Sequence, residues 1–183
     1  MRVIAGKARS VPLKAPLGDK TRPTTDRIKE TLFNIISDEI YGCAFLDLFA
    51  GSGQMGIEAL SRGAKSAVFA ESDKKVCEII KENLAKTKLL DDAKVIRTNI
   101  NASLDPLLSY GPYDIIFMDP PYDFGAEESV LKSILEAHLL AEDGIIIIEA
   151  DLKRNLDMDG LTLTVFREKI YKTNKHIFIK END

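Results

Sequence analysis

The segment Asp119-Pro-Pro-Tyr122 combines groups that suit one kind of chemistry. Its two consecutive prolines fix φ and hold the chain extended directly after an apolar run that ends at Met118. The carboxylate of Asp119 and the backbone carbonyl of Pro120 are hydrogen-bond acceptors, and Tyr122 offers an aromatic face. Acceptors around the N–H bonds of an exocyclic base amine favour a tetrahedral nitrogen with a free lone pair, and an aromatic face supports an unstacked base. We therefore expect methylation of such an amine, with Asp119, Pro120, Pro121 and Tyr122 at the catalytic site.

A second segment, from Asp47 to Gly56, follows another apolar run and contains three glycines. Glycines let a backbone turn tightly and approach a ligand, and the helix that follows presents free N–H groups. Gly51, Gly53 and Gly56 match the GxGxxG pattern of dinucleotide sites. The carboxylate of Asp47 argues against a pyrophosphate and favours the ammonium and sulfonium of S-adenosylmethionine (SAM). Glu71, 20 residues after Gly51, is placed to accept hydrogen bonds from ribose hydroxyls.

The expected reaction needs no metal and no covalent nucleophile, because SAM already carries a good leaving group and alignment with proton handling is sufficient. S-adenosylhomocysteine is then the product. Asn99 follows the third apolar run, where its side-chain oxygen can bind the adenine amine or can simply cap a turn. The expected cofactor contacts are Asp47, Phe49, Ala50, Gly51, Ser52, Gly53, Glu71, Ser72, Asn99 and Ile100.

The elements that must position these residues alternate between apolar runs and helical patterns. Most of the runs lack polar alternation, which is typical of parallel strands covered on both faces. The last two have no helix between them and predict an antiparallel pair. The runs are Ala44–Leu48, Ala67–Ala70, Val95–Ile96, Ile115–Met118, Ile145–Ile148, Leu161–Phe166 and His176–Ile179. We expect an α/β, seven-stranded, Rossmann-like SAM-dependent methyltransferase fold whose loops after the first and fourth strands meet at one edge.

The first 30 residues are basic, whereas the rest of the chain is acidic. They carry eight Lys and Arg against three acids, a balance of +5, although the net charge of the chain is −4. Such a segment predicts a polyanionic partner, although it equally fits a solvated end that aids solubility. Turn residues followed by one long helical pattern predict an extension over residues 1–41, a hairpin plus a helix, before a methyltransferase domain over 42–183. The residues expected to bind RNA are Lys7, Arg9, Lys14, Arg22 and Thr24.

Composition excludes several other classes of protein. No apolar run approaches the roughly 20 residues that span a bilayer, and the first residues lack the apolar segment of a secretory signal. Cys43 and Cys77 have neither metal-site spacing nor a disulfide framework. We therefore expect a cytoplasmic protein with no membrane partner.

The motifs together resemble the RsmD-type family of bacterial methyltransferases that modify a guanine N2 in small-subunit (16S) ribosomal RNA. The resemblance implies an RNA partner in the small ribosomal subunit or an assembly intermediate. It departs at Asn99, where the family usually has Asp, and at Tyr171-Lys172, where it has Tyr-Gly, so no role is assigned to that hairpin. His138 and His176 match no motif and are expected to be ordinary helix and strand residues. The resemblance covers Arg2–Lys7, Thr21–Thr24, Arg27, Phe33–Asn34, Asp47–Gly53, Gly56–Gly63, Glu71–Asp73 and Asp119–Tyr122.

Two other functions use the same features. An adenine-N6 methyltransferase acting on DNA or RNA shares the Asp-Pro-Pro-Tyr motif, although the small size of the chain, without a separate sequence-reading domain, favours an RNA presented by a larger particle. A non-catalytic RNA chaperone that binds SAM or a nucleotide needs only the glycine segment, with the proline segment as a plain turn. The intact motif disfavours this second alternative.

Overall fold

The computed structural model describes residues 1–16, 25–121 and 125–182, and a single sheet dominates these ranges. Its strand order is β3-β2-β1-β4-β5-β7-β6. The first five strands are parallel, whereas β7 is antiparallel to both of its neighbours, β5 and β6. The expected seven-stranded α/β fold with an antiparallel last strand is therefore confirmed. The strands are β1 Ala44–Asp47, β2 Ser66–Glu71, β3 Ala93–Arg97, β4 Tyr113–Met118, β5 Leu140–Asp151, β6 Leu163–Ile170 and β7 Asn174–Glu181.

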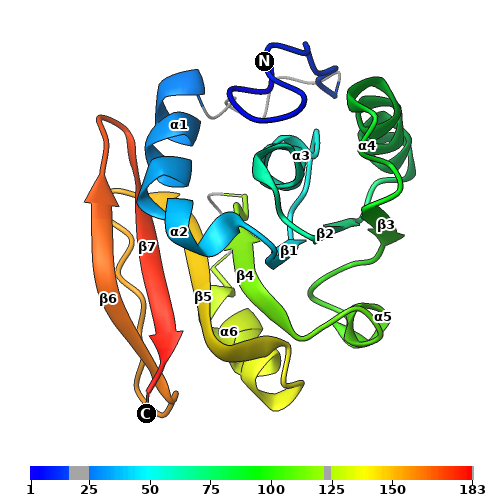
Figure 1. Cartoon of the computed structure of the whole chain (residues 1–183). Helices are drawn as coiled ribbons and strands as arrows, with labels where there is room; N and C mark the ends of the chain where they lie inside the picture. The colour runs from blue at the N-terminus through cyan, green and yellow to red at the C-terminus, as the bar shows by residue number, and fades with distance from the viewer. Residues whose placement is uncertain (17–24, 122–124, 183) are drawn as a thin grey trace.

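Helices cover both faces of the sheet, which explains why its central strands are apolar without alternation (Figure 1). One face carries α1 (Asp26–Ile35), α3 (Gln54–Arg62) and α4 (Lys74–Thr87), and the other carries α5 (Asp105–Leu108) and α6 (Glu127–Glu136). Strand order reverses at β1, which lies between β2 and β4. The loops that follow β1 and β4 therefore leave the same edge side by side, where open α/β sheets bind their ligands.

The single helix expected before Gly42 is wrong, because the structure has two. A break at Ile36, whose φ is −104° and ψ is 24°, separates α1 from the short α2 (Ser37–Ile40). Ile36 and Ile40 are both buried, so the bend turns two apolar side chains toward the core. The hydroxyl of Thr25 caps α1 by accepting a hydrogen bond from the N–H of Ile28 at 3.4 Å.

The two histidines differ in their agreement with expectation. His176 lies in β7 as expected, but His138 lies two residues beyond the end of α6 rather than in a helix. Its φ of +49° is the left-handed conformation that reverses the chain after a helix. The exposed position of His138 assigns it to a turn that leads into β5.

Residues 1–16 form a hairpin, which lies over α3 (Figure 1). A bridge between Arg2 and Pro12 closes it, and the N–H of Val3 donates to the carbonyl of Val11 at 3.0 Å. A Cβ atom on Gly6, whose φ is +80°, would lie 1.8 Å from the carbonyl oxygen of Ser61. Only glycine therefore allows the hairpin to approach α3 so closely.

A buried polar group anchors this hairpin to the domain. The carboxylate of Glu58 on α3 accepts hydrogen bonds from the backbone N–H groups of Ile4 and Ala5, at 2.8 and 3.0 Å. It also pairs with Lys29 at 3.4 Å and with Arg62 at 2.8 Å. Burial lowers the pKa of Lys29, although Glu58 opposes that shift. Two backbone N–H groups of the hairpin therefore belong to a buried ion-pair network, in which the loss of one member would leave a buried charge unpaired. The hairpin is thus part of the core structure and not a loose arm.

Candidate active site

The glycine loop connects β1 to α3 at the carboxyl edge of the sheet. Gly51 and Gly53 have φ values of +52° and +76°, and Gly53 immediately precedes the first residue of α3. Gly56 has a different role, because a Cβ there would lie 2.4 Å from a ring carbon of Phe69. Two glycines therefore shape the turn, and the third lets α3 pack closely against β2.

Asp47 lies beneath this loop and is buried, with 1% of its surface exposed. Its Oδ2 accepts a hydrogen bond from the N–H of Gly56 at 3.2 Å. Burial raises the pKa of Asp47 to about 7, with a further contribution from the charge of Glu71, and the Gly56 hydrogen bond opposes the shift. A cationic ligand above the loop would favour the ionised carboxylate. Asp47 does not line the cleft that opens beside Glu71.

Glu71 ends β2 and joins two loops. Its Oε2 accepts a hydrogen bond from the N–H of Gly51 at 3.1 Å. Its Oε1 accepts from the N–H groups of Ser72 and Asp73, at 2.8 and 2.9 Å. These backbone donors fix the carboxylate in one orientation, and Oε2 retains a lone pair for a ligand hydroxyl.

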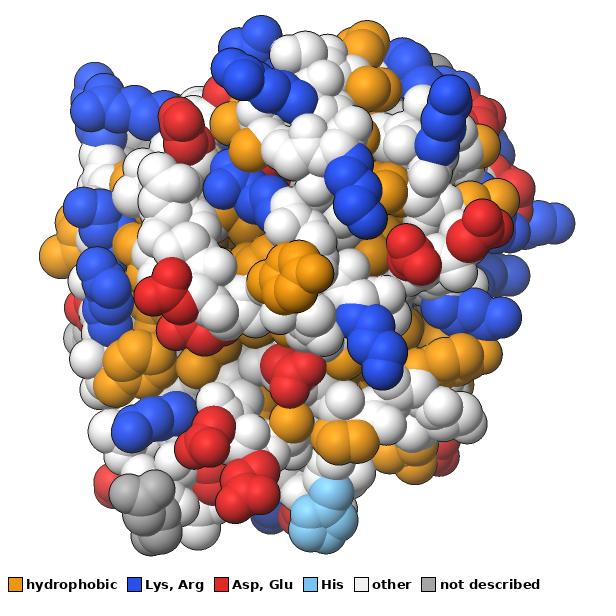
Figure 2. Space-filling view, viewed as in Figure 1, with side chains coloured by type: hydrophobic (Ala, Val, Ile, Leu, Met, Phe, Trp, Pro, Cys, Tyr) orange, Lys and Arg blue, Asp and Glu red, His pale blue; other side chains and the backbone are white. Residues whose placement is uncertain are grey.

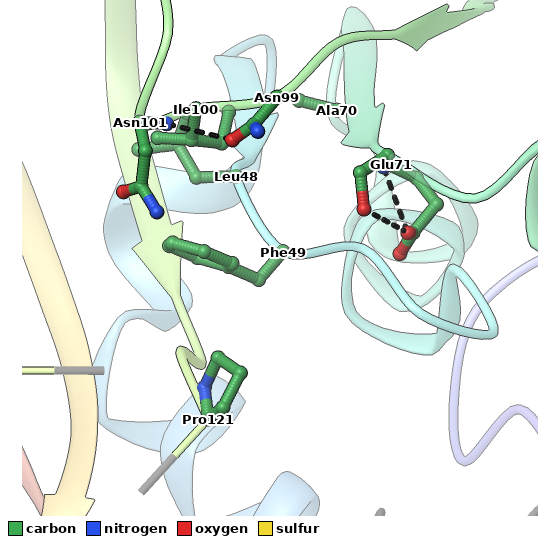
Figure 3. Close-up of a pocket in the computed structure, with 9 residues that line it drawn as sticks. Leu48, Phe49, Ala70, Glu71, Asn99, Ile100, Asn101 and Pro121 are labelled. Atoms are coloured by element: carbon green, nitrogen blue, oxygen red, sulfur yellow. Dashed lines mark hydrogen bonds between the residues drawn. The ribbon is translucent and has the colours of Figure 1, made fainter. Parts of the chain in front are cut away.

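A cleft of about 200 Å³ opens beside Glu71 (Figure 3). In this view Glu71 lies at one end and the turn at Asn99–Asn101 at the other, with Phe49 between that turn and Pro121. The walls combine apolar side chains with polar groups, which suits a planar ring joined to a sugar. The lining residues are Leu48, Phe49, Ala70, Glu71, Ser72, Asn99, Ile100, Asn101 and Pro121.

The structure thus brings Phe49, Glu71, Ser72, Asn99 and Ile100 into one cleft wall. The five other expected cofactor contacts do not line this cleft: Ala50, Gly51, Ser52 and Gly53 lie in the adjoining loop, and Asp47 lies beneath it. The side-chain oxygen of Asn99 accepts a hydrogen bond from the N–H of Asn101 at 3.1 Å, so this residue does cap a turn. Its contact with a base stays a prediction.

The Asp-Pro-Pro segment leaves β4 next to the glycine loop. The N–H of Leu48, directly after β1, donates to the carbonyl of Phe117 at 2.9 Å. Pro120 is buried, whereas Pro121 is exposed and lines the cleft. Tyr122 lies outside the described residues. The proline segment therefore forms one border of the cleft that contains Glu71.

Asp119 has the most strongly perturbed electrostatic environment at this edge. Its pKa lies well above the usual carboxyl range, because surrounding protein desolvates it and because the charges of Glu149 and Asp47 repel its own. The residue nevertheless keeps an exposed surface, so solvent screens part of this effect. An exposed carboxylate among other acids is suited to meet a hydrogen-bond donor that carries or develops positive charge.

Sequence reasoning missed Glu149, which acts on Asp119, and His176, which contacts Glu149 from the next strand. Glu149 is buried in β5 and contacts His176 of β7. One signal for Glu149 was present, because this acid directly follows the apolar run Ile145–Ile148. An acid at the carboxyl end of a buried parallel strand is placed at the ligand-binding edge.

The residues expected to bind RNA occupy different environments. Lys7 and Arg9 are exposed and form no ion pair within the described ranges. Lys14 is also exposed, but its ammonium pairs with Glu82 at 2.7 Å. Arg22 and Thr24 lie outside the described residues. Figure 2 shows Lys and Arg side chains over the upper part of the face where Figure 1 places the N-terminal segment.

Two kinds of feature are absent from the part of the chain that the structure describes. No group of His, Cys, Asp or Glu in this part could hold a metal ion. Within the same ranges, no helix is long and apolar enough to cross a bilayer.

Comparison with known proteins places these features in a family. The model of a family described as Conserved hypothetical protein 95 matches residues 1–180. YlbH of Bacillus subtilis, a candidate rRNA methyltransferase, is 40% identical over 93% of this chain and 94% of its own length. Ribosomal RNA small subunit methyltransferase D of Escherichia coli is 36% identical over 93% and 84%. The solved structure of yhhF, a candidate methyltransferase of Escherichia coli, has a TM-score of 0.85 at 34% identity and covers 100% of this chain and 98% of that one.

Proposed function

The chain belongs to the RsmD-type family described as Conserved hypothetical protein 95, and we propose that it transfers a methyl group from SAM to the N2 amine of a guanine in small-subunit ribosomal RNA. One observation carries the proposal. Glu71 ends β2 and the Asp119-Pro120-Pro121 segment follows β4, and with β1 between these strands both lie at the same edge of the sheet, where Pro121 lines the Glu71 cleft. A cofactor site and an amine-binding site therefore share one border.

The groups in and beside the cleft complement the parts of SAM. The Oε2 atom of Glu71 can accept from a ribose hydroxyl, and the apolar wall with Leu48 and Ile100 can receive the adenine. Asp47, beneath the glycine loop, supplies negative charge for the cationic methionine end. When bound, SAM supplies a methyl group activated by its sulfonium. The further cofactor contacts in this proposal are Phe49, Ala50, Gly51, Ser52, Gly53, Ser72 and Asn99.

The proline segment handles the amine. The carboxylate of Asp119 and the carbonyl of Pro120 accept hydrogen bonds from the two N–H groups and so direct the nitrogen lone pair toward the cleft. Tyr122 supports the unstacked guanine. Because alignment provides most of the rate enhancement in such a transfer, these residues act chiefly by orientation.

Exposed positive charge on the N-terminal hairpin supports the RNA part of the proposal. Lys7 and Arg9 are available for phosphates, and Lys14 can exchange Glu82 for a phosphate. Arg22 and Thr24 belong to the proposed contact by sequence alone. The relatives named for the small ribosomal subunit make that particle, or an intermediate in its assembly, the proposed partner, which sets the site of action in the cytoplasm.

Mass spectrometry of the modified nucleoside tests this function. The protein is incubated with SAM and undermethylated small ribosomal subunits, and the RNA is digested to nucleosides. We expect N2-methylguanosine, and a parallel reaction with Asp119→Ala controls for contaminating enzymes. N6-methyladenosine as the product would instead establish the adenine alternative, and SAM binding without any methylated nucleoside would favour a chaperone.

A further inference from the structure

Three neighbouring strands place polar side chains in one row beside the candidate active site. Met118 of β4 is in register with Ile148 of β5, so Asp119 and Glu149 follow next to each other. Glu149 is in turn the Cα partner of His176 on β7. Residues in register point to the same face of a sheet, and so do residues two positions apart along a strand. Phe117, Ile147 and Phe178 pack in the core cluster that contains side chains of α1 and α3, so the row lies on that face.

Hydrogen bonds hold Glu149 from two sides. Its Oε1 accepts from the side-chain amide of Asn174 at 2.5 Å, and its Oε2 lies 3.2 Å from Nε2 of His176. Because an ionised carboxylate only accepts, Nε2 carries the hydrogen. All three side chains are buried, and that of His176 is completely so. Such a set restricts Glu149 to one position.

His176 is itself oriented by its surroundings. Its Nδ1 lies 3.1 Å from the hydroxyl of Tyr171, and burial raises the pKa of Tyr171 to about 12, so this hydroxyl is a donor. The imidazole also makes edge-to-face contacts with the rings of Phe117 and Tyr171, at centroid distances of 6.1 and 5.1 Å. An imidazole that accepts from Tyr171 at Nδ1 and donates to Glu149 from Nε2 satisfies both ring nitrogens.

We propose that Glu149 is a positioning residue for the reaction and that Asn174, His176 and Tyr171 hold it in place. The inference rests on the proposed function, in which the amine nitrogen gains positive charge as it receives the methyl group. A fixed carboxylate beside Asp119 stabilises that charge without rearranging. It also repels the Asp119 carboxylate toward the open side of the site, where the base must lie.

The titratable groups around this row define the expected pH dependence. Asp47 approaches from β1, Glu149 from β5, and His176 with Tyr171 from β7 and the turn before it. Arg167 and Lys169 lie on the neighbouring β6, where Arg167 acts on Tyr171 and Lys169 is in register with His176. Lys29 on α1 is buried and forms an ion pair with Glu58. Glu149 is therefore the charged neighbour of Asp119 that a single substitution can neutralise without disturbing the glycine loop.

The direction of the pH effect follows from the role of Asp119. Its ionised form is the stronger acceptor for the amine and the form that offsets the positive charge developing there, so activity falls as pH decreases through its pKa. Burial raises this pKa most, and the charge of Glu149 raises it further. Removing that charge lowers the pKa, so the acidic limb of the activity profile moves to lower pH.

The substitution Glu149→Gln tests the proposal, because it removes the charge and keeps an acceptor for Asn174. In single-turnover methylation we expect a rate roughly tenfold lower, less than the loss of a group that contacts the reacting atoms. The dissociation constant for SAM stays unchanged, and the acidic limb moves to lower pH. Glu142→Gln is the matched control, since this exposed acid lies toward the other end of the same strand.

Carboxyl-carbon NMR of the protein without ligand gives a readout that does not depend on activity. The titration midpoint of Asp119 should fall in Glu149→Gln and stay constant in Glu142→Gln. If the wild-type protein methylates no guanine, the proposed function fails while this titration still tests the Glu149 effect. A wild-type rate and an unmoved acidic limb in Glu149→Gln, with an active wild type, would overturn the inference.

A pair of variants at His176 tests the support of Glu149 separately, and applies even if Glu149→Gln does not fold. His176→Gln keeps an N–H donor near the position of Nε2, whereas His176→Phe keeps the ring but removes the donor. We expect the Gln variant to retain most of the activity and the Phe variant to lose several-fold. Equal activity in both variants would show that the imidazole only fills space.

Discussion

In the proposed cofactor half of the site the carboxylate of Glu71 accepts hydrogen bonds from three backbone N–H groups, whereas in the proposed substrate half Asp119 faces the charges of Glu149 and Asp47. The first carboxylate is oriented before a ligand arrives. The second is disfavoured as an anion until a donor or a positive charge comes close. One half is therefore organised for binding, and the other is organised for an event that creates positive charge.

Asp119 should give the largest effect, because in the proposed function it is the group that accepts from the amine. We expect Asp119→Ala to lower the single-turnover rate on the order of 100- to 1,000-fold, whereas Asp119→Asn keeps one acceptor oxygen and is clearly milder. The measurement uses saturating SAM and RNA, with SAM binding checked in each variant. Equal rates for Asn and Ala would show that the negative charge, and not hydrogen-bond acceptance, is required.

Glu71 should affect binding and leave the chemistry intact. Glu71→Ala removes a charge-assisted acceptor worth about 1.5–3 kcal/mol, so the SAM dissociation constant should rise roughly 10- to 100-fold. Glu71→Gln retains an acceptor oxygen and serves as the milder control. Unchanged SAM affinity of the Ala variant in calorimetry would show that Glu71 only holds the two loops together.

Asp47 connects the two halves and should make cofactor binding pH-dependent. Because its folded pKa is raised from 3.8 to about 7, the ionised form that favours a cationic ligand appears only as pH rises through about 7. SAM affinity should therefore increase as pH rises through about 7, and Asp47→Asn should flatten this dependence.

The stability of the ligand-free protein should change in the opposite direction. Because the folded pKa of Asp47 is raised, its contribution to stability declines as pH rises from its unfolded to its folded pKa value. Thermal denaturation at pH values between these two pKa values should show that this decline is absent from Asp47→Asn.

The hairpin should show the smallest effect of the four, because each phosphate contact contributes little by itself. Neutralising Lys7, Arg9 and Lys14 together should reduce the salt dependence of RNA binding by just under one unit of slope for each phosphate that is no longer neutralised. SAM affinity should remain constant. A triple variant of Lys86, Lys88 and Lys132, which are exposed on α4 and α6 or directly after α4, controls for net charge. If both triple variants change the slope equally, the hairpin has no special role.

The outcome at particular elements shows how far sequence reasoning reaches. The apolar runs identified every strand, although β5 extends from Leu140 to Asp151 and so begins five residues before its run at Ile145. The break at Ile36 was not predicted, because both segments share one helical spacing and only packing against the sheet selects the bend. The charge pattern of the basic segment also fits a solvated end, yet the backbone of this hairpin donates hydrogen bonds to the buried Glu58.

Sequence alone determined the strand pattern, the glycine loop and the proline segment, because these depend on local spacing and on the conformational limits of glycine and proline. Tertiary structure decided which acids meet. Asp119, Glu149 and His176 are separated by 30 and 27 residues in the chain, and only the register of β4, β5 and β7 places them in one row. Desolvation by the surrounding protein and the charges of Glu149 and Asp47 then raised the pKa of Asp119, since both depend on what surrounds a group in space and not on its neighbours in sequence.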